Sequence, residues 1–358
     1  MNDALNNILN DMSKNLNNIL NDKDVEEEKQ EQIEKLSSVK ILLIGYGYWG
    51  QIWCKTIQKS QYELVAIVDP LFKEKQYDEE FFSIKSFRDV SEVSIEFTHA
   101  IIATPAENHL HTYKTLKEKF GLADENILVE KPVGVSYEEA NEMRFCHHGF
   151  VWLYDEAYQI FKERKNSLGK LFSYKTIRAS MGPRIRTDIS ILEDYLFHDL
   201  YLYFDIFDIN AQDMPRVKDI EYDRYFSEPI KASGINLKLD SYFFPMQVEM
   251  FSSWWHPQKE RKIILVGSMG SLIWENDSIF INRSHYEKKA NFTDKHGNKG
   301  YELLTYPLLE IQTDIKSEKS NLEKQLDNFI NSKESNTSQL LMKTWTLIKL
   351  INATYEEK

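Results

Sequence analysis

The sequence has little cysteine and no long hydrophobic run. Only Cys54 and Cys146 occur among 358 residues, and neither belongs to a CxxC pair or to a metal-ligand spacing. Isolated cysteines are typical of proteins from a reducing compartment, so we expect a cytoplasmic protein. The longest apolar stretches, such as 41–44 and 100–103, are as short as single strands, and the first residues lack the regions of a signal peptide. Neither a membrane span nor a secretion signal is predicted.

Positive charge is in deficit as well. The chain carries 44 Lys and Arg against 56 Asp and Glu, which gives a net charge of −12. Because nucleic acids and membrane surfaces are bound through basic patches, we expect neither as a partner. Of the nine histidines, only the pairs His147–His148 and His109/His111 lie close together, and neither pair comes with a carboxylate or thiolate at zinc spacing, so no metal site is predicted. A chain of this length is sufficient for about two domains.

Residues 1–38 differ in composition from the rest of the chain, since they are rich in Asn, Asp, Glu and Lys and contain no Gly or Pro. The heptapeptide LNNILND occurs at 5–11 and again at 16–22, and the apolar residues fall near helical spacing. We predict a helical or partly disordered extension. A frayed amphipathic segment and an oligomerisation helix both remain open, and we expect a homo-oligomer, either a dimer or a tetramer.

Strand-like and helix-like runs alternate from residue 39 to residue 153. Strands are predicted at 39–44, 64–68, 98–103, 127–129 and 150–153, and helices at 49–57, 107–120 and 137–147. Such alternation implies right-handed crossovers and a parallel sheet, so residues 39–154 are predicted to form an α/β domain of the Rossmann type.

After residue 155 the strands follow one another with few helices between them. The predicted elements are helices 155–165, 189–207, 318–331 and 339–353, and strands 171–179, 217–225, 235–239, 243–254, 262–266, 271–274 and 278–281. Successive strands favour an antiparallel or mixed sheet. Residues 155–358 are therefore predicted to be an α+β domain for substrate binding and oligomerisation, with a large, mostly antiparallel open-faced sheet.

The first predicted strand is followed by a complete GxGxxG motif, made of Gly45, Tyr46, Gly47, Tyr48, Trp49 and Gly50. In a dinucleotide fold, Gly45 permits the tight turn, Gly47 lets the backbone approach the pyrophosphate, and Gly50 allows close packing of helix and strand. The second strand ends at Asp69, where such folds place the acid that binds the adenosine ribose hydroxyls. The alternatives are a glycine-rich turn and a strand-end turn acid. Both features together favour NAD as the cofactor.

Four further motifs follow in order along the chain. They are the ATP…H segment 103–109, the EKP signature at 130–132, the segment 182–198 with its Asp-x-x-x-His end, and the SW…P.K.R…VGS stretch 253–268. With them, the chain from residue 39 onward resembles the Gfo/Idh/MocA oxidoreductase family, and within it the nucleotide-sugar subgroup. The resemblance implies a cis Lys131–Pro132 bond and cofactor contacts from Thr104, Pro105, His109, Glu130 and Lys131.

The expected chemistry is the oxidation of a secondary alcohol, which needs a hydride acceptor and a base. Lys131, at the carboxyl end of a strand, can steady the developing alkoxide. Asp194 and His198 share one face of a helix, so His198 can transfer the proton while Asp194 orients its ring. A solvated lysine and a satisfied core histidine are the alternatives. By charge alone, Asp199 is as good a candidate as Asp194, and the family register selects Asp194.

The substrate residues are predicted less directly. Arg184 and Arg186 are candidate contacts for a charged substrate, since guanidinium groups bind phosphate well, and Tyr154 is a further candidate. Many relatives carry an acid three residues after the histidine, but this chain has Tyr201 there, and Tyr201 is assigned no role. Ordinary surface arginines are the alternative for the pair.

The function predicted is an NAD(H)-dependent sugar oxidoreductase acting on CH–OH groups, with a nucleotide-linked sugar as the substrate and the ring C3 position as one candidate. The alternatives are a dehydrogenase of a free sugar or inositol, and a non-catalytic regulator that binds NAD or sugar. A scaffold with a purely structural Rossmann domain is disfavoured by the intact cofactor motif.

Overall fold

The computed structural model describes residues 39–71, 84–181, 189–223, 233–240, 246–293, 296–297, 299–312, 315, 317–332 and 337–356. The predicted extension 1–38 lies outside these residues, so its structure stays a prediction. By its contacts the chain divides into two compact units, one ending at Ala100 and one beginning at Ile101. The predicted boundary after residue 154 also stays a prediction. No helix among the described residues has the length and apolar character that crossing a membrane requires.

The first unit contains the start of the predicted α/β pattern. Its elements are β1 (Lys40–Ile44), α2 (Tyr48–Lys59), β2 (Glu63–Val68) and β3 (Lys85–Phe87). β1 pairs in parallel with β2, and β2 pairs in parallel with β3. The apolar run of β1 is fully buried at Leu42 and Leu43, and α2 buries Trp53 and Ile57. Both predicted strands and the predicted helix are confirmed here, whereas the three-residue β3 was not predicted.

Residues after Ala100 continue the parallel pattern. The elements are β4 (His99–Ile102), α3 (His109–Phe120), β5 (Ile127–Val129), α4 (Tyr137–Glu142) and β6 (His147–His148). The strand order is β3-β2-β1-β4-β5-β6, which is the order of a dinucleotide-binding Rossmann sheet. The Rossmann part of the predicted fold class is therefore confirmed.

Two predicted elements in this stretch are wrong. The predicted helix 137–147 ends at Glu142, because His147 and His148 instead pair with Leu128 and Val129 as strand β6. The predicted strand 150–153 is a short 3-10 helix, Val151–Tyr154. Short apolar runs fit either a strand or a buried turn, and periodicity alone does not distinguish them.

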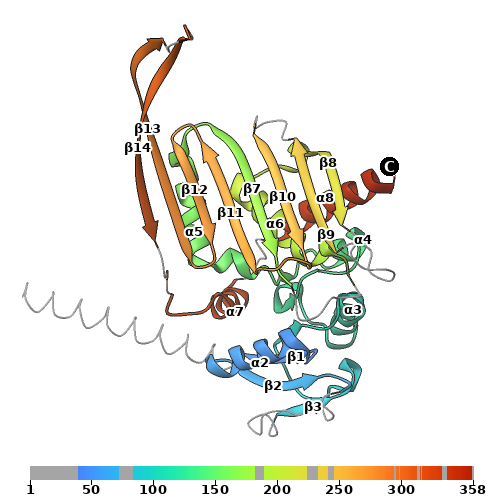
Figure 1. The fold of residues 1–358 in the computed structure, drawn as a ribbon. Coiled ribbons are helices and arrows are strands. Elements are labelled where there is room, and N and C mark those ends of the chain that lie inside the picture. Colours follow the sequence, from blue (N-terminus) through green and yellow to red (C-terminus); the bar gives the residue numbers. More distant parts are fainter. Residues whose placement is uncertain are drawn as a thin grey trace, which may run out of the picture. The chain divides into compact units, whose positions relative to one another are not determined.

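The second sheet has eight strands. They are β7 (Leu171–Ala179), β8 (Arg216–Asp223), β9 (Gly234–Asp240), β10 (Gln247–Ser253), β11 (Glu260–Gly267), β12 (Gly270–Glu275), β13 (Ser278–Thr293) and β14 (Lys299–Gln312). Their order is β14-β13-β12-β11-β7-β10-β9-β8, and β10 runs parallel to β7 while the other pairs are antiparallel. This confirms the predicted mostly antiparallel sheet (Figure 1).

The edge of this sheet was predicted incompletely. The strand expected at 278–281 runs from Ser278 to Thr293 and pairs with β14, which was not predicted, as a long hairpin (Figure 1). β13 becomes mostly polar after Ile281, and β14 carries adjacent leucine pairs and Pro307, so neither strand shows a clean two-residue period. The predicted strand 243–254 is observed as Gln247–Ser253, and part of the predicted range lies outside the described residues.

Helices cover one face of the sheet, as Figure 1 shows for α5 and α6. The helices of this part of the chain are α5 (Glu156–Arg164), α6 (Phe197–Phe207), α7 (Asn321–Asn331) and α8 (Ser338–Glu356), with short 3-10 helices at Lys165–Leu168 and Ala211–Asp213. Further short 3-10 helices lie earlier in the chain, at Val90–Glu92, Ala106–Asn108 and Asp124–Asn126. A π-helical turn, Leu192–Leu196, leads into α6. Ten of the eleven α6 residues are buried, so this helix is a core element that fixes its side chains rigidly.

Candidate functional site

The loop between β1 and α2 has a backbone that requires glycine at two positions. Gly45 has a φ of 93°, which L side chains rarely adopt, and its N–H donates to the carbonyl of Val68 at 2.7 Å. At Gly50 a Cβ would collide with the carbonyl oxygen of Gly45, so the loop and the helix can pack this closely only without a side chain. This geometry agrees with the tight turn and the close packing expected of these two glycines.

The start of α2 has the properties of an anion site. Gly47 is the N-cap, and a Cβ built there would meet no atom of the described residues within 4 Å. Gly47 has no side chain that could cap this end, and the first turn of the helix holds no acidic residue. A helix N-terminus binds phosphate through its first N–H groups and its dipole, and the space beside Gly47 leaves room for such a ligand, so the diphosphate of a dinucleotide fits this loop. Of its other members, Tyr46 is buried, Tyr48 is exposed and Trp49 is half-buried.

Asp69 follows β2 and is held by two backbone groups. Its Oδ2 accepts the N–H of Tyr46 at 2.8 Å, and its Oδ1 accepts the N–H of Leu71 at 2.8 Å. The bond to Leu71 is the one expected of a turn acid, and the bond to Tyr46 ties the carboxylate to the glycine loop. A carboxylate has about four acceptor directions, so Asp69 can also accept from ribose hydroxyls.

The second unit supplies the other predicted cofactor residues. Thr104 follows β4, and its carbonyl oxygen accepts from Nε2 of the buried His109 at 2.8 Å. The Oγ1 of Thr104 is buried and has no hydrogen-bond partner among the described residues. A buried hydroxyl without a partner is rare in native proteins and suits a site that a polar ligand completes. Pro105 beside it is exposed.

The Glu130-Lys131-Pro132 segment follows β5. The Lys131–Pro132 bond is cis, as the resemblance implies. Glu130 is buried, and its Oε2 accepts the N–H of Lys131 at 3.1 Å. A Cβ at Gly149 would collide with this carboxylate, so a side chain at that position would displace Glu130. Glu130 is therefore positioned by its surroundings.

Lys131 and Asp194 form a buried ion pair. The Nζ of Lys131 lies 2.8 Å from Oδ1 of Asp194 and 3.1 Å from its carbonyl oxygen, and the two side chains are 7% and 13% exposed. The other carboxylate oxygen, Oδ2, accepts from Nε1 of Trp254 at 3.0 Å. The solvated-lysine alternative is thus excluded. Asp194 belongs to the π-helical turn before α6, a distortion that is frequent at functional sites.

Trp254 is a buried residue of this site. It is 3% exposed, and its indole N–H holds Asp194. Only the tertiary fold brings these two residues together, since they lie 60 positions apart. No sequence signal at that separation could have shown the bond. The neighbouring Trp255 is 47% exposed and is the tryptophan available for stacking.

His198 lies one turn after Asp194, at the start of α6. Its Nδ1 lies 3.1 Å from the hydroxyl of Tyr201, a residue to which the sequence had assigned no role. Burial, and after it the positive charges of Lys131, Arg178 and Arg261, hold the pKa of His198 well below its usual range. The imidazole is therefore neutral at neutral pH. Asp194 was expected to orient the His198 ring, but the bonds described for its carboxylate go to Lys131 and Trp254.

Asp199, which by charge alone was as good a candidate as Asp194, forms a structural ion pair. Its Oδ1 accepts from Nε of Arg178 at 2.9 Å and from its terminal nitrogen at 2.8 Å, with both side chains buried. Arg261 lies directly opposite Arg178 in the sheet, and its guanidinium stacks 3.8 Å above the Trp152 ring. Arg178 is thus bonded to Asp199 and is not available to bind a phosphate.

The predicted substrate residues are not brought to the Lys131–Asp194 pair by any described contact. Arg184 and Arg186 lie outside the described residues. The hydroxyl of Tyr154 donates to Oδ1 of Asn328 in α7 at 2.9 Å, and burial raises the pKa of Tyr154 to about 12. The substrate roles of these three residues stay predictions.

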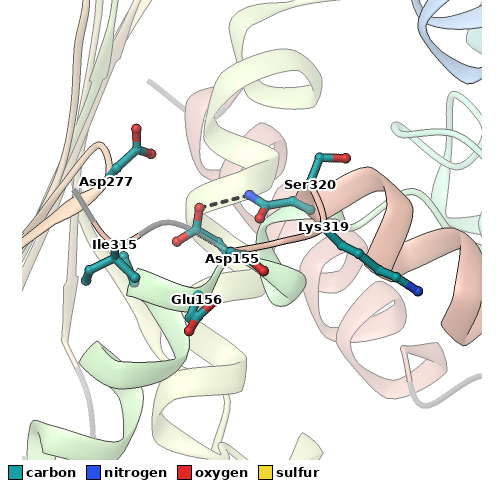
Figure 2. A pocket seen from close by; sticks show the side chains of 9 residues that line it. Asp155, Glu156, Asp277, Ile315, Lys319 and Ser320 are labelled. Carbon is teal, nitrogen blue, oxygen red and sulfur yellow. Dashed lines mark hydrogen bonds between the residues drawn. The ribbon is translucent and has the colours of Figure 1, made fainter. Parts of the chain in front are cut away.

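A separate polar cavity of about 200 Å³ lies beside Tyr154, where α5 and α7 begin. Asp155, Glu156 and Asp277 line it with Lys319, and Oδ2 of Asp155 accepts from Asn321 at 2.9 Å (Figure 2). None of Lys131, Asp194 and His198 lines this cavity. In the described part of the chain, no group of three His, Cys, Asp or Glu side chains is arranged to hold a metal ion.

Comparison with known proteins identifies the N-terminal domain. Residues 39–146 match the model of the Gfo/Idh/MocA family, described as an oxidoreductase family with an NAD-binding Rossmann fold. The match falls on the predicted Rossmann domain, and its description confirms NAD as the predicted cofactor. Comparison with curated proteins finds no match.

Solved structures share the fold over most of the chain. UDP-N-acetylglucosamine 3-dehydrogenase GnnA from Acidithiobacillus ferrooxidans is 15% identical, with a TM-score of 0.64 over 87% of this chain and 95% of that one. GenD2 from gentamicin A biosynthesis, in complex with NAD, is 15% identical, with a TM-score of 0.67 over 89% and 95%. A myo-inositol dehydrogenase from Corynebacterium glutamicum is 17% identical, with a TM-score of 0.63 over 89% and 96%. Identities this low show the fold alone.

Proposed function

We propose that this protein is an NAD(H)-dependent dehydrogenase or ketoreductase that acts on a secondary hydroxyl of a sugar. The observation that carries the proposal is the buried Lys131–Asp194 pair, with His198 one helical turn away in the same core. A buried ion pair costs desolvation energy and is weak evidence for stability, so a role in chemistry accounts better for it. Bound NAD would accept the hydride from the sugar, or NADH would supply it.

Lys131 has one hydrogen-bond donor left for the reacting oxygen. An ammonium has three N–H groups, and two of them are directed at Oδ1 and the carbonyl oxygen of Asp194. The third can donate to the substrate oxygen and stabilise the alkoxide that develops on it. In the reduction direction this ammonium also gives the oxygen its proton and becomes an amine, and oxidation returns the proton. Asp194 keeps Lys131 in place, and Trp254 keeps Asp194 in place.

The cofactor would be held by the residues predicted for it. The glycine loop at the start of α2 suits the diphosphate, and the Asp69 carboxylate suits the adenosine ribose. A carboxylate accepts both ribose hydroxyls but repels a 2′-phosphate, so we expect NAD to be preferred over NADP. Lys73, the nearest positive residue after it in the chain, lies outside the described residues. Thr104 Oγ1 and Glu130 complete the expected contacts.

For the substrate, we propose a nucleotide-linked sugar that reacts at a ring hydroxyl, with C3 as one candidate. The name of one structure with this fold, a UDP-N-acetylglucosamine 3-dehydrogenase, supports this choice. The exposed Trp255 suits stacking on a sugar face. Because Arg178 is bonded to Asp199, the charge that a diphosphate needs would have to come from Arg184 and Arg186.

A free sugar or inositol is the second candidate, and the myo-inositol dehydrogenase with the same fold favours it. It needs no arginine cluster. A panel assay separates the two, in which NADH absorbance is followed with UDP- and dTDP-sugars, free hexoses and inositols. Activity confined to the free sugars, with no binding of a nucleotide sugar, would exclude the first candidate.

Lys131→Met tests the catalytic proposal itself. It should lower turnover by roughly two or more orders of magnitude and leave NADH binding, followed by fluorescence, nearly unchanged. Lys162→Met is the matched control, since Lys162 pairs with Asp205 at 2.8 Å on another face of α6. If the wild type binds NADH but turns over no substrate of the panel, the protein is a binding relative without activity.

A further inference from the structure

The partner of His198 is a phenol in place of a carboxylate. Tyr201 lies three residues further along α6, on the same side of the helix, and its hydroxyl lies 3.1 Å from Nδ1 of His198. The Tyr201 ring is fully buried and stacks on Phe150, with ring centroids 4.4 Å apart and planes 5° apart. The hydroxyl is therefore held rigidly against the imidazole.

The direction of this hydrogen bond follows from the inventory of donors and acceptors. The Tyr201 hydroxyl faces Nδ1 of His198 and the backbone N–H of Trp152, and the latter can only donate. If Nδ1 carried a proton and donated it as well, the phenolic O–H would be buried without an acceptor among the described residues, which is unfavourable. If the phenol donates to a bare Nδ1, both groups are satisfied. The second arrangement places the ring proton of neutral His198 on Nε2.

The charges around the ring act in the same direction. Lys131, Arg178 and Arg261 face it from the end of β5, from β7 and from β11, and all three disfavour an imidazolium. The acid beside it, Asp199, is bonded to Arg178. Burial raises the pKa of Tyr201 above its ordinary value, so the phenol keeps its proton. A carboxylate at position 201 would instead attract an N–H at Nδ1 and stabilise the charged ring.

We propose that Tyr201 is a positioning residue that holds His198 as a neutral imidazole with its proton on Nε2. The histidine then offers the reacting oxygen an N–H group in place of a lone pair. It polarises a carbonyl or stabilises an alkoxide, while Lys131 exchanges the proton. This inference rests on the proposed function and adds to it that His198 faces the reacting oxygen. His198 is then a hydrogen-bond donor to the reacting oxygen, whereas the spacing of Asp194 and His198 predicts it as the general base.

The test is the protonation state of the ring nitrogens, measured by NMR on full-length protein labelled with [15N]histidine. The His198 signals are assigned by their loss in His198→Asn. In the wild type at neutral pH, Nε2 should appear protonated and Nδ1 bare. In Tyr201→Phe, which keeps the ring stacked on Phe150, this single tautomer should give way to a mixture. A proton on Nδ1 in the wild type, or an unchanged tautomer in Tyr201→Phe, would overturn the inference.

Tyr174→Phe is the matched control. Tyr174 is fully buried on β7, and its hydroxyl has no hydrogen-bond partner among the described residues, so this variant should leave the His198 signals unchanged. The NMR readout needs no turnover and is separate from the test of the proposed function. If the wild type is active, Tyr201→Phe should also lower kcat roughly 3- to 10-fold with little change in KM, as expected for one hydrogen bond.

Discussion

Substitutions in the Lys131–Asp194 pair should change the stability of the protein and its activity independently of each other. Lys131→Met removes the cation and leaves a carboxylate that is 13% exposed, with the Trp254 indole as its described partner. Breaking one side of a buried pair costs about 3–5 kcal/mol, and the lower end applies because Trp254 still donates to Asp194. We therefore expect Lys131→Met to lower the free energy of unfolding by about 3 kcal/mol.

The double variant Lys131→Met/Asp194→Asn should recover most of that loss. It buries no charge, and the amide oxygen introduced at position 194 can still accept the Trp254 N–H, so its stability should fall within about 1 kcal/mol of the wild type. Turnover should stay as low as in Lys131→Met. Urea unfolding gives the stabilities and a coupled NADH assay gives the rates. A double variant as unstable as the sum of the single variants would refute the idea that the buried charge is the source of the loss.

Four more outcomes are expected. Trp254→Phe should release Asp194 and lower kcat roughly tenfold while the Kd for NADH, measured by fluorescence, stays unchanged. Gly47→Ala should fold normally but weaken NADH binding, whereas Gly50→Ala should fail to fold or lose binding altogether, because its methyl group would meet the carbonyl of Gly45. The pKa of buried His148 is lowered to about 4, so the folded state binds fewer protons than the unfolded one. Stability is then complete above about pH 6.5 and falls by up to about 3 kcal/mol as the pH approaches 4; His148→Asn should flatten this slope in urea titrations. Deletion of residues 1–37 should leave NADH binding unchanged, and gel filtration would show whether the oligomer changes.

The elements best predicted from the sequence are those whose local signals agree. β1, α2 and β2 were placed within one or two residues, because an apolar run, a glycine turn and a second apolar run follow one another without interruption. β13 and β14 failed for the opposite reason. Neither sequence alternates cleanly between apolar and polar residues, and over most of their length they are strands through their pairing with each other in a hairpin.

For the candidate site, the sequence predicts which residues take part but not how they are bonded to one another. Motifs could select Lys131, Asp194 and His198, because each lies at a fixed offset from a local signature. They could not predict which atoms bond, since Lys131 and Asp194 are 63 positions apart and meet only through the packing of the second unit. The sequence therefore led to a triad in which Asp194 orients His198, whereas the described bonds add Trp254 and Tyr201 as the residues that hold the two members.

One buried helix explains why this arrangement can differ from a simple triad. Every residue of α6 but Asp205 is buried, so the hydrogen bonds of its polar side chains have to come from inside the protein. Asp199 satisfies Arg178, and Tyr201 satisfies His198. If an acid stood at position 201, a second buried carboxylate would lie on this helix, with one arginine already committed to Asp199. A phenol provides the hydrogen bond without that charge, and it leaves the positive charge near His198 to act on the reacting oxygen. The replacement of an acid by Tyr201 is thus compatible with retained chemistry and does not by itself argue for an inactive relative.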